Sequence, residues 1–338
     1  KIREHFDLIM EGIEKNSRNA TIAQAFLRYQ NDPSNSCRQL ELLSTKWTKE
    51  FKEKMAISVM ERLSIAGEIE RLHRLVAETC ADCEPAQRYK ILIPAAYMEL
   101  TRGDPNIAPD LVKIAKKVTP SKQYPSVQIF YAKLMELMGR DGKVVKIYEK
   151  LRNNFRSEWR VFLEYGYYLL HHNDIKNAIR IVKKGLKIHK GSGRLWAFRV
   201  QLEGLSGSGV EAQISLLTNA VNNVPKSGEV WCEAARIAMN PLTEYFSIDA
   251  AKKYLEFTYR FTPQHGDTLI EMIRAEILDR GVGPHLNKIR QLFINSEGNY
   301  GQLYLFIKKN DERSMISVFN DAVKEVVEDI EENSDLYA

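Results

Sequence analysis

Residues 193–196 read Gly-Arg-Leu-Trp, and residues 228–231 read Gly-Glu-Val-Trp. In both segments a glycine precedes a tryptophan by three residues, and apolar residues at helical spacing follow. The two tryptophans, Trp196 and Trp231, lie 35 residues apart. A spacing of this length that returns elsewhere in a chain is the mark of a repeat architecture.

The same anchor position does return. Trp159 lies 37 residues before Trp196. Leu269 follows Trp231 by 38 residues, and Tyr304 follows Leu269 by another 35. We expect the glycines that precede the last four anchors to serve a sharp turn before a helix, because glycine tolerates positive φ. These glycines are Gly193, Gly228, Gly266 and Gly301.

Each anchor opens an apolar helix, which a short polar break separates from a second helix. For Trp196 the predicted helices cover 195–205 and 212–224. Second helices tend to end just before proline, which lacks the N–H that a helix needs. Further pairs are predicted at 56–66 with 68–79, 89–100 with 108–118, 129–139 with 144–151, 158–170 with 175–189, and 229–239 with 248–261. We interpret 240–247 as an insertion, because it is longer than the other breaks.

Together these segments predict an all-α fold, an α-solenoid of about eight helix–turn–helix repeats, with the last repeat starting at Tyr304. One helix pair cannot bury its apolar stripe alone, so neighbouring pairs must stack. We expect the tryptophan and tyrosine anchors to fill the pockets between helices. We expect residues 1–50 to be an N-terminal helical segment that caps the array, 51–323 to be the solenoid, and 324–338 to be an acidic tail.

Composition bounds the class of protein. The chain has 338 residues, a net charge of +5 and 44% hydrophobic residues, which is ordinary for a globular protein and permits nucleic-acid contact without implying it. No apolar run approaches the length of a membrane helix. Four cysteines are too few for a disulfide scaffold and indicate a reducing compartment. The chain starts at lysine without a signal sequence, so we interpret it as a fragment of a longer protein.

Several segments resemble the tetratricopeptide (TPR) family and its RNA-processing relative, the HAT (half-a-TPR) family. The first-helix resemblance rests on Trp196-Ala-Phe198 with Glu203, and on Phe130-Tyr-Ala132 with Glu136. The second-helix resemblance rests on 144–151. Residues 190–330 also resemble the terminal repeat array of the splicing factors that bridge the tri-snRNP, through 225–231 and 299–304. The insertion at 240–247 and Leu269 in place of an aromatic residue depart from that pattern.

No motif indicates catalysis, a metal or a cofactor. Cys80-Ala-Asp-Cys83 lacks the second ligand pair that a zinc site needs, and His73 is its only neighbouring histidine. His171 and His172 are interpreted as residues at a helix C-terminus, where the helix dipole favours a cation. The glycine-rich stretch 204–209 follows a helix, whereas a dinucleotide fingerprint follows a strand. We therefore predict that the protein is not an enzyme.

Two charged surfaces are the candidate binding sites. The first is a basic patch without a carboxylate between 176 and 194, which suits a phosphate backbone or an acidic protein partner. Its members are Lys176, Arg180, Lys183, Lys184, Lys187, Lys190 and Arg194. The alternative is a solvated outer face, and no aromatic residues are interleaved for stacking on single-stranded RNA.

The second surface is the concave wall, which first helices line in TPR-like arrays, as the resemblance implies. Its polar residues are expected to face solvent and to bind a peptide or a helix, because they mix both signs of charge. They are Glu164, Arg199, Glu233, Arg236, Glu271 and Arg274.

The leading hypothesis is a non-enzymatic scaffold for protein partners inside a large RNA-processing assembly. The resemblance points to pre-mRNA splicing and to the nucleus, with the cytoplasm as the second choice and neither secretion nor a membrane expected. One alternative is direct RNA binding through the helix at 176–194. Another is a structural solenoid of an axonemal, cytoskeletal or transport complex, which only its partners would distinguish. No cofactor and no small-molecule substrate is expected, and contact with RNA is expected to be indirect.

Overall fold

The computed structural model of the chain describes residues 49–295, 298–308 and 314–337, together with Leu8, Glu11, Gly12 and Lys15. Side chains in the first of these ranges are described from Met55 onward. The predicted N-terminal segment 1–50 therefore lies almost wholly outside the described residues. The chain forms two compact units, Lys1–Phe155 and Arg156–Ala338.

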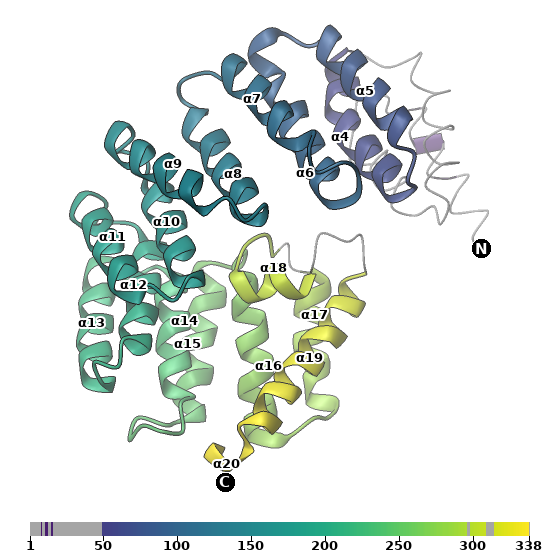
Figure 1. Ribbon diagram of the computed structural model, residues 1–338. Coiled ribbons are helices and arrows are strands. Elements are labelled where there is room, and N and C mark those ends of the chain that lie inside the picture. The colour runs from purple at the N-terminus through teal and green to yellow at the C-terminus, as the bar shows by residue number, and fades with distance from the viewer. Residues whose placement is uncertain are drawn as a thin grey trace. The chain divides into compact units, whose positions relative to one another are not determined.

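The described residues of the first unit form helix pairs. Helix α4 (Lys49–Ile65) pairs with α5 (Ile69–Asp82), and α8 (Tyr124–Leu137) pairs with α9 (Asp141–Asn154). Between them, the short 3₁₀ helix η2 (Pro85–Gln87) leads into α6 (Tyr89–Arg102), which pairs with α7 (Ala108–Val118). The first helices of the pairs, α4, α6 and α8, contact one another in sequence (Figure 1).

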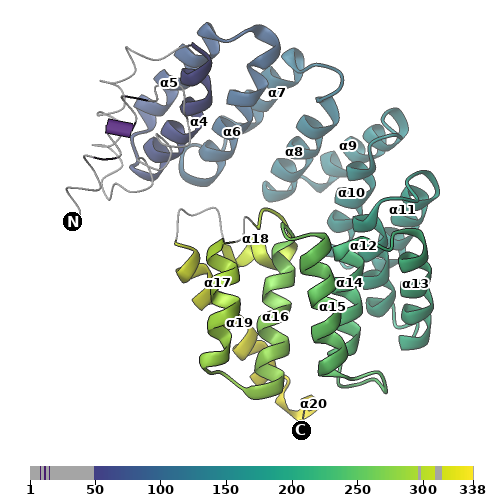
Figure 2. The ribbon, with the colours of Figure 1, turned by 180° about the vertical axis from the view of Figure 1, so that it is seen from behind.

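The second unit continues the same plan. Three of its pairs are α10 (Trp159–His171) with α11 (Ile175–Ile188), α12 (Gly193–Leu205) with α13 (Val210–Asn223), and α14 (Gly228–Ala238) with α15 (Ile248–Phe261). Next come α16 (Gly266–Arg280), η3 (Pro284–Leu286) and α17 (Asn287–Asn295). The unit ends with α18 (Gln302–Lys308), α19 (Met315–Glu332) and α20 (Ser334–Tyr337). The first helices α10, α12, α14, α16 and α18 contact one another in order, as the two views of the ribbon show (Figures 1 and 2).

The predicted helix pairs are confirmed, as is the all-α solenoid. Two starts are wrong by five residues or more. Helix α4 begins at Lys49 and not at residue 56, and α8 begins at Tyr124 and not at residue 129. In α8, Pro125 at the first turn suits a helix start. Local chemistry explains other starts. The Asp174 side chain accepts a hydrogen bond from the backbone N–H of Asn177 at 3.2 Å. The Ser247 hydroxyl oxygen accepts one from the backbone N–H of Ala250 at 3.3 Å.

The boundary that the sequence predicted between solenoid and acidic tail, at residue 324, falls inside α19. Val326 is only 1% exposed and belongs to a core cluster with Leu269, Tyr304 and Val318. The helix continues because apolar residues keep recurring on its inner face while the carboxylates lie outside. Among the residues that the structure describes, no helix is both long enough and apolar enough to cross a bilayer.

Three of the four anchor glycines have a different role from the one predicted. Positive φ is found at Gly301, at +128°, but not at Gly193, Gly228 or Gly266. At those three positions the next repeat approaches so closely that a Cβ has no room. It would lie 2.6 Å from Ser227 Cβ, from Thr262 Oγ1 and from Tyr304 Cβ, respectively. Glycine is therefore needed for the contact between repeats and not for a turn.

Candidate partner-binding surfaces

Tryptophan anchors are fastened to the loops that precede their helices. The indole nitrogen of Trp196 donates to the Lys190 carbonyl at 2.8 Å, and that of Trp231 donates to the Pro225 carbonyl at 2.8 Å. In both cases the partner lies six residues earlier. Trp196, Leu269 and Tyr304 are buried as predicted, whereas Trp159 and Trp231 remain half-buried. The same bond in two successive repeats fixes the ends of their first helices in equivalent positions.

The residues two positions before the anchors join one repeat to the next. Arg194 Nε lies 3.4 Å from Glu229 Oε1, across 35 residues. Glu229 also accepts hydrogen bonds from the Tyr300 hydroxyl at 2.7 Å and the Ser227 hydroxyl at 2.8 Å. Burial alone would raise the pKa of Glu229, but these hydrogen bonds and one from its own backbone outweigh burial and lower it. Glu229 is thus held as a carboxylate that orients Arg194.

Two aromatic rings also hold the Arg194 guanidinium. Its guanidinium carbon lies 3.5 Å from the centre of the Tyr300 ring and 5.6 Å from that of the Trp159 ring. Both distances are within the range of cation–π attraction. The side chain nevertheless keeps 37% of its surface exposed. An arginine that is held by two aromatic rings and by a carboxylate along one edge has few orientations left for its guanidinium.

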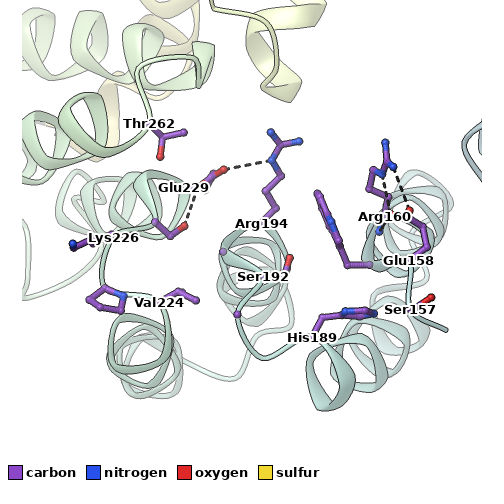
Figure 3. A pocket seen from close by; sticks show the side chains of 15 residues that line it. Ser157, Glu158, Arg160, His189, Ser192, Arg194, Val224, Lys226, Glu229 and Thr262 are labelled. Carbon is purple, nitrogen blue, oxygen red and sulfur yellow. Dashed lines mark hydrogen bonds and ion pairs between the residues drawn. The ribbon is translucent and has the colours of Figure 1, made fainter. Parts of the chain in front are cut away.

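Trp159, Arg194 and Glu229 line a groove of about 1020 Å³ along the N-terminal ends of α10, α12 and α14. The loops that follow α11 and α13 complete its walls (Figure 3). Trp159 supplies an aromatic surface, and Lys226 is an exposed cation on the wall. Figure 3 shows the terminal nitrogens of Arg194 pointing away from Glu229. The sequence placed Arg194 in the basic patch and gave no sign of the groove.

Asp267 has the corresponding role in the next repeat. Its carboxylate accepts hydrogen bonds from the backbone N–H of Gln302 at 3.1 Å and from the backbone N–H of Tyr304 at 2.8 Å. Both amides belong to the first turn of α18, where the helix dipole favours a negative charge. The buried Asp267 side chain therefore caps the first helix of the last repeat from the repeat before it.

A network of ion pairs crosses the first helices. Arg236 Nε lies 2.8 Å from Glu271 Oε1, and the same guanidinium contacts Glu233 and Asp267. Arg274 continues the network, with Nε at 3.2 Å from Glu271 Oε2 and a further contact to Asp329 on α19. The network joins α14, α16 and α19.

The expectation that the concave-wall residues face solvent is wrong. Arg199, Glu233 and Glu271 are 4%, 6% and 4% exposed, and Glu164, Arg236 and Arg274 are half-buried. Opposite charges on neighbouring helices pair with one another and are buried together. The sequence was analysed one helix at a time, so this pairing was not predicted. Their role in binding a peptide stays a prediction.

Burial acts on the charged groups of this network. Burial raises the pKa of Glu233, and the nearby Arg236 offsets that effect only in part. The pKa of Glu271 is lowered, because Arg236 and Arg274 together outweigh burial. Glu271, which lies between the two arginines, is the more firmly ionised of the two carboxylates.

The basic patch divides into two groups. Lys176, Arg180, Lys183, Lys184 and Lys187 are exposed on the outer face of α11, and Lys190 is exposed in the turn that follows. The opposite face of α11 is buried through Ala178, Ile181, Val182, Gly185 and Leu186. None of the six cations forms an ion pair with any residue that the structure describes. Arg194 does not belong with them, because it lies on α12 and points into the groove.

The remaining motifs lie where the sequence placed them. Cys80 and Cys83 are free thiols at the end of α5, and His73 contacts Glu99 of α6 at 2.7 Å. The described residues contain no group of three His, Cys, Asp or Glu side chains arranged to hold a metal.

His172 caps the end of α10, and its Nδ1 lies 2.9 Å from the Tyr168 carbonyl. The glycine-rich stretch 204–209 begins in the last residues of α12, and its residues 206–209 make the turn to α13, with Gly207 and Gly209 at positive φ. Cys37 lies outside the described residues.

Sequence reasoning missed Glu229, Asp267 and Tyr300. The positions of Glu229 and Asp267 could have been found from the sequence, because each lies two residues before an anchor and about one repeat from its partner. No repeat spacing identifies Tyr300, since 71 residues separate it from Glu229.

The chain is similar to known proteins built from helical repeats. A family model described as "PRP6, TPR-like domain" matches residues 1–323. A TPR-containing protein of Dictyostelium discoideum is 45% identical over 150 residues, which are 44% of this chain and 11% of that protein. The chain thus spans a small fraction of that relative. The crystal structure of yeast Tom70 is similar with a TM-score of 0.54 and 13% identity, over 90% of this chain and 61% of that one, which is a likeness of fold.

Proposed function

The chain belongs to the family of PRP6 TPR-like domains, and from that membership we propose that it is a non-enzymatic scaffold for protein partners in a pre-mRNA splicing assembly of the nucleus. The match over residues 1–323 is the single observation that carries this proposal. The helical repeat fold agrees with it, because such arrays generally present surfaces to other proteins and do not perform catalysis.

The groove at the ends of α10, α12 and α14 is the binding site that the geometry supports best. Arg194 is held there by Glu229, Tyr300 and Trp159, with its terminal nitrogens pointing away from Glu229. A guanidinium fixed in this way is suited to a carboxylate, which it binds through two parallel hydrogen bonds. The partner segment is therefore acidic, with an apolar residue that packs on Trp159.

Preorganisation is the physical reason why this site is preferred to the concave wall. Arg236 and Arg274 are already paired with Glu271, so a ligand would have to break buried ion pairs to reach them. Arg194 has its own carboxylate at only one edge and loses little side-chain freedom on binding.

Direct RNA binding through α11 is the second candidate function. One observation favours it: five exposed cations follow one helix, and a sixth, Lys190, follows in the next turn, without described ion-pair partners. Affinity for single-stranded RNA would then fall steeply with salt, by about 0.7 logarithmic units per neutralised phosphate for each tenfold rise in salt concentration. A flat salt dependence would remove this candidate.

Affinity purification of the tagged protein from its own cells, with and without nuclease, tests the proposed function. Splicing proteins recovered in equal amounts after nuclease would support the scaffold. Axonemal, cytoskeletal or transport proteins in their place would keep the solenoid and overturn the splicing assignment. Partners that disappear with nuclease would favour RNA binding through α11.

A further inference from the structure

The outer face of α11 carries a row of cations at regular spacing. Lys176, Arg180, Lys183 and Lys187 follow one another at intervals of four, three and four residues. Residues at such intervals lie along one side of a helix, so the row is about 16 Å long. All four side chains are exposed, and the inner side of the same helix is packed in the core.

The same unit contains a row of opposite charge with the same spacing. Asp321, Glu325, Glu328 and Glu332 follow one another along α19 at intervals of four, three and four residues. Glu325, Glu328 and Glu332 are exposed, and Asp321 is half-buried. Glu328 has one surface ion pair, 3.5 Å from Lys324, which is itself 74% exposed. A pair of this kind contributes little and is readily exchanged.

The two rows do not meet within one chain. Helix α11 packs against α10 and α12, whereas α19 packs against α16, α17 and α18. Both views of the ribbon place the two helices at opposite ends of the second unit (Figures 1 and 2). A carboxylate row that pairs with α11 along its length would therefore belong to another molecule.

We propose that the second copy of this chain is the partner of α11, with the carboxylate row of its α19 laid along the cation row of α11. The interval pattern reads the same in both directions, so parallel and antiparallel helices both bring four opposite charges face to face. Like spacing keeps every pair in register along the helices, as it does for charges that flank a coiled coil. This inference goes beyond the proposed function and does not depend on it.

The chemistry of the contact sets its properties. The facing rows are charged and exposed, so the association is weak and strongly screened by salt. It joins two different surfaces, so after one contact the first copy still has its carboxylate row to offer and the second copy its cation row. Such a contact builds larger oligomers unless the rotation between copies closes a ring.

Sedimentation equilibrium of the full chain, after nuclease treatment, tests the proposal. At an ionic strength of about 0.05 M, the weight-average mass should rise with protein concentration, and at about 0.5 M it should stay at the monomer value.

K183E/K187E and E328K/E332K should each weaken association by about tenfold or more, since each turns two attractive pairs into repulsive ones. Circular dichroism would show that these surface variants keep their helices. K143E/K146E, which reverses two exposed cations of α9, changes the net charge equally and should leave association unchanged.

Mixing the two variants is the decisive step. In the mixture, the unaltered α19 of K183E/K187E can face the unaltered α11 of E328K/E332K, so unlike copies regain one contact with all four opposite charges, in either helix orientation. The mixture should therefore associate although neither variant does so alone. A monomeric wild-type chain at low salt would overturn the proposal. A mixture that stays monomeric would overturn it too, as would association that disappears with nuclease.

Discussion

Tyr300 donates its hydroxyl to Oε1 of Glu229 at 2.7 Å, although 71 residues separate the two. The tyrosine ring lies at the same time against the guanidinium of Arg194. One residue at the end of the array thus fixes side chains of two earlier repeats. Two lining residues of the groove, Arg194 and Glu229, are therefore held by a later segment of the same chain.

Tyr300→Phe tests this link. The substitution keeps the ring and removes the hydroxyl, which leaves the Glu229 carboxylate, 14% exposed, with one donor fewer. We expect the free energy of unfolding to fall by about 1.5 kcal/mol, as for other hydrogen bonds to charged groups. Urea denaturation measures the change. Tyr245→Phe is the matched control, since Tyr245 donates to Glu211 at the same 2.7 Å but is 40% exposed. An equal loss in both variants would contradict the account.

The pH dependence of stability follows from the carboxylates of the second unit. The pKa values of Glu229 and Glu271 are lowered in the folded chain, so their contribution is fully present above the unfolded value of about 4.3. It is lost as pH falls through the lowered folded values. Urea midpoints measured from pH 6 down to about pH 3 should therefore decline, and Tyr300→Phe should show a shallower decline. A midpoint that is constant over this range would show that these carboxylates carry no such stability.

Substitution of an anchor glycine should disturb the contact between repeats. In Gly228→Ala the new Cβ would lie 2.6 Å from Thr262 Oγ1, where the backbone is also close. We expect a loss of about 1–3 kcal/mol from overpacking, measured by thermal or urea denaturation. Gly142→Ala is the control: it lies in α9 with no atom within 4 Å of the added Cβ, and helix propensity should make it neutral or stabilising. A neutral Gly228→Ala would mean that the repeats are free to move apart.

Arg236→Met should be among the most damaging substitutions in the second unit. It leaves Glu233 and Glu271 buried with less positive charge around them, at a cost of about 3–5 kcal/mol at neutral pH. The loss should shrink at low pH, where the carboxylates take up protons. Arg280→Met removes an arginine that is 63% exposed and pairs with Asp279, so it should cost less than about 1 kcal/mol. Similar losses in the two variants would mean that the buried network adds nothing.

Periodicity was sufficient to predict the architecture. The spacing of Trp159, Trp196 and Trp231 fixed the repeat, and the resemblance to HAT and TPR arrays is confirmed by the family match. The role of the glycines was not predictable, because close approach between repeats leaves no local trace. The same reason explains the error on the concave wall: pairing of Arg236 with Glu271 is visible only once two helices are side by side.

The claim at the centre of this account is that the groove beside Arg194 holds a protein partner. A photo-crosslinking amino acid at Lys226, on the groove wall, measures this directly in cells, and the same group at the exposed Thr218 of α13 is the control. We predict a protein adduct at 226 that is absent at 218 and is reduced by Arg194→Gln. Adducts of equal yield at both positions, or no protein adduct at 226, would contradict the claim.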